Sequence, residues 1–465
     1  MRLWTALGFG KTDSGLRFLG MLIGLGIIGL QWWVARQFRV SVPFTMLILF
    51  ALSPTVLVYA DSLRGYGLGV LSMFFMVGAF RRMVEKPSRK RIGLALLAAV
   101  LAVQSMYFNA VLLFAAGTGG AAVALRRRNW RLVFSLLVVG TIAALSLLPY
   151  CDPLSRQYRW NAIVKAPVNY SWLFRIFTQA ITASGDFMFF IWIVVFLVAL
   201  FACSYRLWHV EPNKSDTHTD KALFLPSMMI VGIVSYAVFL RRSDLPTQVW
   251  YYVAIMGFLS VAMDVSIDLL ISGNWIGRSI RMGAAMILAA LVLPAAWKSA
   301  HVRFTNVDLI AAKLESVAGP KDLILFPRWW PGITFARYYR GKASWTTLPE
   351  IADMSVQRFD LLKKKMAEMD PIGPLHNKII GTLASGHRLW VVGILPPLNP
   401  GEMPGQIAPL PAGPMEQEPY LTVWTRQTTW LLQQHIRKYT QVEVLCPDPV
   451  LPFENIPLYV AEGWN

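Results

Sequence analysis

Long apolar runs, separated by short polar and basic segments, occupy the chain up to residue 297. A bilayer core of about 30 Å is crossed by roughly 20 helical residues, and the longer runs reach that length. The pattern predicts ten membrane helices: Leu16–Val34, Val42–Tyr59, Gly65–Phe80, Ile92–Tyr107, Ala110–Leu125, Leu132–Tyr150, Phe187–Tyr205, Ala222–Leu240, Val249–Ile271 and Met282–Trp297. Residues 1–297 are therefore expected to form a transmembrane domain, with residues 151–186 as a long outer loop that carries surface helices.

After residue 297 the pattern changes to short apolar runs that alternate with helical periodicity. It predicts strands at Asp322–Pro327, Arg388–Ile394 and Val442–Cys446, helices at Val307–Val317, Gln357–Met369 and Leu421–Tyr439, and a Pro/Gly-rich loop at Leu395–Pro414. Alternating strands and helices favour a parallel or mixed sheet covered by helices. Residues 298–465 are therefore expected to form a water-exposed α/β domain.

Composition supports this division of the chain. Hydrophobic residues make up 55% and charged residues 15%, whereas soluble domains carry about 25% charged residues. Cys151, Cys203 and Cys446 lie far apart in the sequence, which indicates neither a disulfide framework nor a zinc site. The expected fold is a polytopic α-helical membrane protein, with about ten transmembrane helices and a C-terminal α/β soluble domain.

Charge distribution orients the predicted helices. The chain has 44 Lys and Arg against 26 Asp and Glu, a formal net charge of +18. The basic residues cluster between apolar runs, which is typical of membrane topology, so no nucleic-acid partner is expected. The loops between successive predicted helices lie on alternate sides of the membrane. The loops on one side contain seventeen basic residues, and those on the other side contain seven. By the positive-inside rule the richer set is cytoplasmic, and the N-terminus and residues 298–465 face outward.

Asp61, Arg64 and Tyr66 form the most informative short segment, at the expected outer end of two membrane helices. Polar groups at this depth are costly, and they usually face a cavity or one another. A functional site and an Asp61–Arg64 pair that closes a hairpin remain equally open.

Arg241 and Arg242 begin an expected outer loop, against the orientation bias of the other arginines. Arginine matches phosphate oxygens with two hydrogen bonds, so this pair is a candidate for binding a phosphate at headgroup level. Trp250 and Tyr251 follow, and they are candidates for lining a sugar or lipid path. An ordinary aromatic belt is the alternative for these two rings.

Arg328, Trp330, Arg337 and Tyr338 follow the first predicted strand of the tail. Ligands of α/β sheets bind beyond the carboxyl ends of strands, and aromatic rings with arginines suit a sugar or an anionic group. Packing onto the membrane domain explains the same residues equally well.

Two further patterns favour structural interpretations. Gly24, Gly26 and Gly29 match a nucleotide-binding spacing, but they lie inside a lipid-length helix, which favours close helix packing. Asp264 and Asp268 are expected near a cytoplasmic end, where hydration is favoured over a proton relay.

Four segments carry a resemblance to a known family: Lys11–Arg17 before a Gly-rich helix, Leu52-Ser53-Pro54 followed by Asp61–Tyr66, Pro246–Tyr252, and Asp322–Pro327 with Tyr338-Tyr339-Arg340-Gly341. The chain resembles the bacterial GT-C glycosyltransferases of the protein-mannosyltransferase and lipid A aminoarabinose-transferase type. The resemblance covers nearly the whole chain, although each motif is degenerate.

The resemblance implies a polyprenyl-phosphate-linked sugar donor, inversion at the anomeric carbon and an active site at the outer face of a bacterial inner membrane. The tail would be periplasmic, and the acceptor would be a glycan, a lipid or a protein. Asp61 is the candidate catalytic group. The candidates for the donor phosphate and lipid are Arg64, Tyr66, Arg241, Arg242, Trp250 and Tyr251, and those for substrate are Arg328, Trp330, Arg337 and Tyr338. No metal ligands are assigned, and the cofactor is left open, a divalent metal included.

One departure from the family changes the expectation. In the family the catalytic base lies in a first outer loop, after a first transmembrane helix. Only fourteen residues precede Gly15 here, so the chain is expected to lack both elements, and the base is not assigned to Asp13. The alternatives to a glycosyltransferase are a transporter or flippase of a lipid-linked sugar and a non-catalytic membrane assembly protein.

Overall fold

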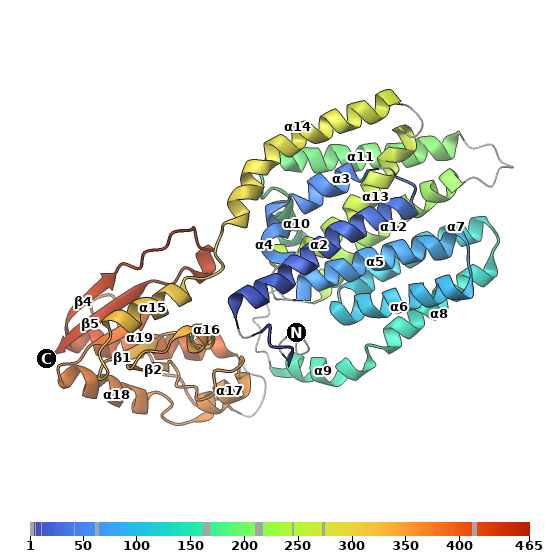
Figure 1. Ribbon diagram of the computed structural model, residues 1–465. Coiled ribbons are helices and arrows are strands. Elements are labelled where there is room, and N and C mark those ends of the chain that lie inside the picture. The colour runs from blue at the N-terminus through green and yellow to red at the C-terminus, as the bar shows by residue number, and fades with distance from the viewer. Residues whose placement is uncertain are drawn as a thin grey trace. The chain divides into compact units, whose positions relative to one another are not determined.

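The computed structural model describes residues 4, 6–10, 12–40, 42–60, 65–160, 168–209, 217–243, 246–271, 275–411 and 416–465, with the backbone alone for residues 60 and 156–160. The chain divides into two compact units (Figure 1). The first, here called the helical unit, contains residues 1–152 and 165–300. The second, the C-terminal unit, contains residues 153–164 and 301–465.

The described residues include eight helical spans that are long and apolar enough to cross a membrane. These spans contain α2 (Asp13–Gln37), α5 (Gly65–Glu85), α7 (Asn109–Arg126), α8 (Trp130–Leu145), α11 (Phe187–Trp208), α12 (Thr217–Arg242), α13 (Val253–Ile271) and α14 (Trp275–Ala300). The protein is thus a polytopic helical protein with a small C-terminal sheet.

Two predicted membrane helices differ from these eight. Ile92–Tyr107 forms α6 (Arg89–Ser105), of 17 residues. Val42–Tyr59 is divided into α3 (Phe44–Met46), the π-helical turn η1 (Leu47–Ala51) and α4 (Pro54–Ala60). Pro54 lacks an N–H and disfavours helical geometry in the residue before it, which explains a break at this point.

The spans at α5 and α13 are the most buried of the eight, and that at α14 is the least buried. Glycine permits close contact at several helix crossings, because a Cβ at Gly78 would lie 2.0 Å from the Trp33 ring. The expected packing role of the Gly24, Gly26 and Gly29 series holds only for Gly26. A Cβ there would lie 2.9 Å from Leu71, whereas nothing lies within 4 Å at the other two positions.

The segment expected to carry surface helices contains η2 (Leu148–Tyr150), α9 (Cys151–Trp160) and α10 (Tyr170–Ile181). Helix α10 begins at a capped end, where the Asn169 side chain accepts a hydrogen bond from the Trp172 N–H. The Thr55 hydroxyl of α4 donates to the Ala180 carbonyl at 2.8 Å. This bond fixes the end of α10 against the broken helical segment.

The C-terminal unit contains a five-stranded mixed sheet in the order β2-β1-β3-β5-β4. Its elements are α15 (Val307–Val317), β1 (Leu323–Phe326), α16 (Pro331–Tyr338), β2 (Ser344–Thr347), α17 (Phe359–Ala367), α18 (Gly373–Ala384), β3 (Leu389–Val392), α19 (Gln417–His435), β4 (Ile436–Val442), η4 (Pro452–Glu454) and β5 (Leu458–Trp464). Strands β1, β2 and β3 are parallel, and β5 is antiparallel to both β3 and β4.

Alternate residues of the central strands enter two different cores. Leu323 and Leu325 of β1 belong to one hydrophobic cluster with α17, α18 and α19. Ile324 and Phe326 belong to another cluster with α15 and α16. Because successive strand side chains point to opposite faces, the sheet is covered by helices on both sides. The predicted α/β organisation is confirmed.

A buried carboxylate fixes the start of β1 against the start of β3. Asp322 accepts hydrogen bonds from the Gly319 and Arg388 N–H groups at 2.8 and 3.0 Å, and from Trp390 Nε1 at 3.0 Å. Arg388 Nε adds a contact of 3.1 Å. Burial favours the neutral acid, but these donors outweigh it and hold the pKa of Asp322 below its ordinary value.

The strand prediction at Val442–Cys446 is wrong, because the strand is β4, at Ile436–Val442. Most of its side chains are exposed at a sheet edge, so the strand lacks the apolar run on which the prediction relied. Strands β2 and β5 were not predicted, since β2 is only four residues long and polar at both ends. Residues 395–411 contain no helix or strand, as the loop prediction requires.

Candidate functional site

Aromatic rings from five segments meet at one end of α5, α7 and α12. Tyr251 contacts Phe108 and Tyr66, with ring centroids 5.3 and 6.3 Å apart, and Trp250 lies 5.1 Å from Tyr59. The members of this aromatic cluster are Tyr59, Tyr66, Tyr107, Phe108, Tyr236, Phe239, Trp250 and Tyr251. We call this end of the helices the aromatic end.

A short 3-10 turn, η3 (Val249–Tyr252), presents Trp250 and Tyr251 to the cluster. It is held from two sides. The Tyr236 hydroxyl of α12 donates to the Tyr251 carbonyl at 2.5 Å. On the other side the Tyr252 hydroxyl donates to the Leu173 carbonyl of α10 at 3.1 Å, and it lies 3.2 Å from Thr247 Oγ1. These bonds explain how so short a turn can hold two large rings in defined positions.

The cluster has a buried floor and a more open rim. Tyr236 and Phe108 are 2% and 5% exposed, whereas Tyr107 is 45% exposed. Tyr66, Trp250 and Tyr251 are half-buried. Half-buried rings offer apolar faces for a lipid chain or a sugar ring, and they are positioned by the floor beneath them.

Arg241 and Arg242 form the last turn of α12, directly after Phe239 and Leu240. Arg241 is half-buried and Arg242 is exposed. Residues three apart on a helix share a face, so Arg242 lies on the same side of α12 as Phe239 of the cluster. The structure therefore brings a cationic group next to the aromatic rings.

Asp61 and Arg64, the predicted catalytic group and one predicted phosphate ligand, lie outside the described residues. In the sequence they fall between Tyr59 and Tyr66, both of which belong to the aromatic cluster.

Five members of the cluster were not among the predicted site residues: Tyr59, Tyr107, Phe108, Tyr236 and Phe239. The sequence contained a signal for Tyr107 and Phe108. The link between the predicted helix that ends at Tyr107 and the one that starts at Ala110 is very short. These two residues must therefore lie at the same end of the helices as Gly65. Tyr236 and Phe239 sit within an apolar helix, where nothing distinguishes a cluster-facing ring from a lipid-facing one.

Asp264 and Asp268, predicted to be hydrated, are held in an ion-pair network between α13 and α14. Asp264 is fully buried, and its Oδ1 accepts from Arg281 Nη2 at 2.6 Å and from the Thr45 N–H at 2.7 Å. Asp268 lies 3.2 Å from Arg281 Nη1. The hydration prediction is wrong for Asp264, because Arg281 compensates its charge inside the bundle.

The four predicted substrate residues of the C-terminal unit contact one another in two pairs. Arg328 pairs with Glu418 at 3.2 Å, and its guanidinium lies 5.5 Å from the Trp330 ring. Arg337 lies 5.9 Å from the ring of Tyr338. Two cavities of about 500 and 410 Å³ occur in this unit, and none of these four side chains lines either one.

Metal ligation and similarity to known proteins give no further assignment. Within the part of the chain that the structure describes, no group of three or more His, Cys, Asp or Glu side chains is placed to hold a metal ion. The sequence matches no family model and no curated protein. The geometry of the aromatic end is therefore the main guide to function.

Proposed function

We propose that the protein is a membrane glycosyltransferase that binds a polyprenyl-phosphate-linked sugar at the aromatic end and transfers the sugar to an acceptor. The observation that carries the proposal is the meeting of Tyr66, Trp250 and Tyr251 beside the arginine-bearing end of α12. An amphipathic donor needs apolar and aromatic surface for its lipid and sugar, with cations for its phosphate. The resemblance to GT-C glycosyltransferases supports the same assignment.

In this proposal the acceptor hydroxyl attacks the anomeric carbon of the donor, and the bond from that carbon to the phosphate oxygen breaks. The phosphate leaves with the bonding electrons, so negative charge develops on it, and Arg241 and Arg242 are the candidates for stabilising that charge. The acceptor proton passes to a carboxylate, for which Asp61 is the candidate. Attack opposite the leaving group inverts the anomeric centre.

In this proposal the chain lies in a bacterial inner membrane and has about ten transmembrane segments. These are the eight long spans together with α6 and the broken α3–η1–α4 segment. The aromatic end and the C-terminal unit would face the periplasm. The excess of basic residues in the opposite set of loops supports this orientation.

The test is transfer of label in proteoliposomes that contain polyprenyl-phosphate-linked pentose or hexose. We expect the wild-type protein to move label from lipid to an added glycan, lipid A or periplasmic protein acceptor. Arg241→Ala and Arg242→Ala should each lower the rate by roughly tenfold or more, since a hydrogen bond to a charged group contributes about 1.5–3 kcal/mol. Arg131→Ala, at the opposite end, is the matched control. Unchanged turnover in both arginine variants would remove them from the site.

A flippase for a lipid-linked sugar is the second candidate, and the broken α3–η1–α4 segment favours it. Interrupted membrane helices often surround transported substrates. A fluorescent lipid-linked sugar distinguishes the two functions. Movement across the bilayer with the sugar–phosphate bond intact would support the flippase, whereas cleavage without movement would support the transferase.

A further inference from the structure

The opposite end of α5, α7 and α12 is rich in charge, and we call it the basic end. Its interacting groups include the cations Arg39, Arg81, Arg126, Arg127 and Lys221 and the carboxylates Glu85 and Asp220, and the charge of Lys221 also interacts with that of Asp268. Cations thus outnumber carboxylates. Asp220 and Lys221 are only 1% and 2% exposed, so this excess is not simply a solvated surface.

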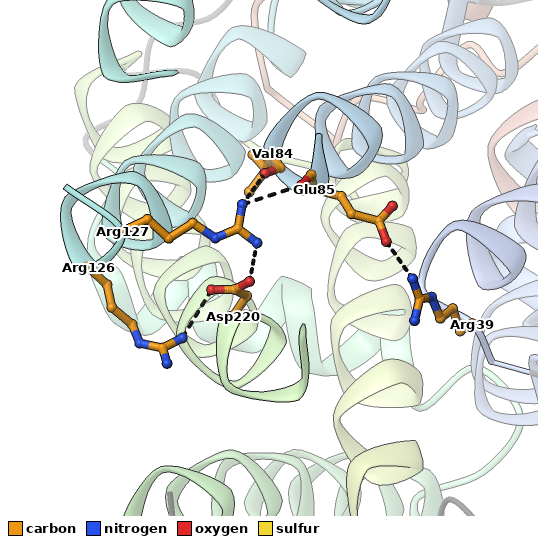
Figure 2. A network of polar contacts seen from close by, with 6 residues as sticks. All are labelled: Arg39, Val84, Glu85, Arg126, Arg127 and Asp220. Atoms are coloured by element: carbon orange, nitrogen blue, oxygen red, sulfur yellow. Dashed lines mark hydrogen bonds and ion pairs between the residues drawn. The ribbon is translucent and has the colours of Figure 1, made fainter. Parts of the chain in front are cut away.

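Figure 2 shows how the carboxylates of the basic end are already engaged. Asp220 Oδ1 lies 3.1 Å from Arg126 Nη1, and its Oδ2 contacts Arg127. Glu85 Oε1 binds Arg39 at 2.9 Å. Arg127 also donates to the Val84 carbonyl at 2.8 Å and so caps the end of α5.

Arg81 is the exception within this network. It is 1% exposed, and its Nε, Nη1 and Nη2 have no hydrogen-bond partner among the described residues. Its guanidinium lies 5.5 Å from the Phe38 ring, and its charge interacts with those of Glu85, Asp220, Arg127 and Arg39 without a direct contact. A buried guanidinium without any hydrogen bond is strongly unfavourable, so Arg81 in this state indicates a missing anion.

A second cation lies close to Arg81. Lys221 of α12 is 2% exposed, and it is close enough for its charge to interact with that of Arg81. Lys221 directly follows Asp220, which lies in the first turn of α12. Backbone N–H groups in the first turn of a helix favour negative charge.

We propose that Arg81 and Lys221 form a phosphate-binding site at the basic end, separate from the sugar-transfer site. Arginine binds phosphate oxygens through paired N–H groups, and phosphate is the anion that a membrane surface offers at this depth. The Arg39–Glu85 pair is the exposed part of the network, with side-chain exposures of 65% and 25%. Surface pairs of this kind are weak, so its opening admits the phosphate at little cost.

The phosphate has two possible sources, an anionic phospholipid headgroup and a soluble phosphate. The full-length protein in neutral detergent would be heated with phosphatidylglycerol or with phosphatidylcholine. In parallel it would be heated with inorganic phosphate or with chloride at equal ionic strength. A bound phosphate should raise the unfolding midpoint by roughly 5 °C at saturation. Phosphatidylglycerol alone having this effect assigns a headgroup, and inorganic phosphate having it assigns a soluble ligand.

Variants locate the effect. Arg81→Gln and Lys221→Gln should each abolish most of the midpoint shift, whereas Arg89→Gln, which loses the same charge at an exposed position of the same end, should keep it. Native mass spectrometry of the wild-type protein provides a second readout that needs no variant. The proposal is overturned if neither phosphate source stabilises the wild type above its control. It is equally overturned if both Arg81→Gln and Lys221→Gln retain the full shift.

Discussion

The aromatic end and the basic end belong to the same three helices, α5, α7 and α12. Tyr66 and Arg81 of α5 mark the two ends, 15 residues or about 22 Å apart along the helix. At the aromatic end the phenol hydroxyls of Tyr236 and Tyr252 donate to backbone carbonyls. At the basic end Arg81, Asp220 and Lys221 are buried charged groups, and Arg81 has no hydrogen-bond partner among the described residues.

This difference indicates two kinds of site. Hydrogen bonds from neutral hydroxyls hold η3 in a fixed position, which suits the proposed role of this surface in orienting a large donor. A buried guanidinium without a bond is stable only because the surrounding structure compensates it, and it gains most when an anion arrives. On the two proposals, the aromatic end is organised before its ligand binds, whereas the basic end is completed by its ligand.

The largest predicted effect distinguishes two arginines of the helical unit: Arg281, whose side chain is 10% exposed, and the buried Arg81. Arg281→Gln should destabilise the protein by about 3–5 kcal/mol, because it leaves the fully buried Asp264 with an uncompensated charge. Arg81→Gln should leave the stability unchanged or raise it when no phosphate is present. Unfolding midpoints of both variants in phosphate-free neutral detergent check the contrast.

The control for this contrast is the double variant with Arg281→Gln and Asp264→Asn. Removing both charges should restore most of the lost stability, because replacing a whole buried pair is far less costly than breaking it. Equal losses in the two single variants would show that Arg81 is compensated as well as Arg281 is, and the distinction between the two ends would then fail.

The second prediction uses the C-terminal unit, where a buried charge is fully bonded. Asp322→Asn should lower the stability of this unit by about 2–3 kcal/mol, because charge-assisted bonds to Gly319, Arg388 and Trp390 are lost. Hydrogen exchange at residues 323–326 and 389–392 of the full-length protein measures the loss. Glu350→Gln, which breaks an exposed pair with Lys378, is the matched control and should change little.

The pH dependence of stability provides a further test of this prediction. The pKa of Asp322 is lower in the folded protein than in the unfolded chain. Its contribution to the stability of the C-terminal unit is therefore fully present above about pH 4. The contribution should decline as the pH falls from about 4 through the folded value. Wild-type protection should therefore approach that of Asp322→Asn in strong acid. If the difference in hydrogen-exchange protection between the wild type and Asp322→Asn stays constant with pH, the charge of Asp322 does not have the proposed role.

Much of the membrane architecture could be predicted from the sequence, because lipid-length apolar runs are a local signal. The break at residues 44–60 was not predicted, although Pro54 is a local signal for it, and one of its anchors is distant in the sequence. The Thr45 N–H there binds Asp264, 219 residues later. In the C-terminal unit, β4 was misplaced because an exposed edge strand lacks an apolar run.

The candidate sites divide in the same way. Tyr66, Trp250 and Tyr251 could be selected from their position at one expected face, and the structure brings them together. Tyr236 could not, because its role depends on a bond to a turn that lies 15 residues later in the chain. Arg81 was counted only as a loop charge, and its burial depends on how α2, α5, α7 and α12 pack.

The smallest predicted effect tests whether the aromatic end is organised in advance. Tyr236→Phe keeps the ring but leaves the Tyr251 carbonyl without its donor, at an expected cost of about 1–2 kcal/mol. Tyr107→Phe is the matched control, because its ring belongs to the same cluster but Tyr107 is 45% exposed. We expect Tyr236→Phe to weaken donor binding several-fold, measured by titration of a lipid-linked sugar, while Tyr107→Phe binds like the wild type. If Tyr236→Phe loses stability but binds donor normally, η3 serves packing alone. The donor would then not depend on a preset position of Trp250 and Tyr251.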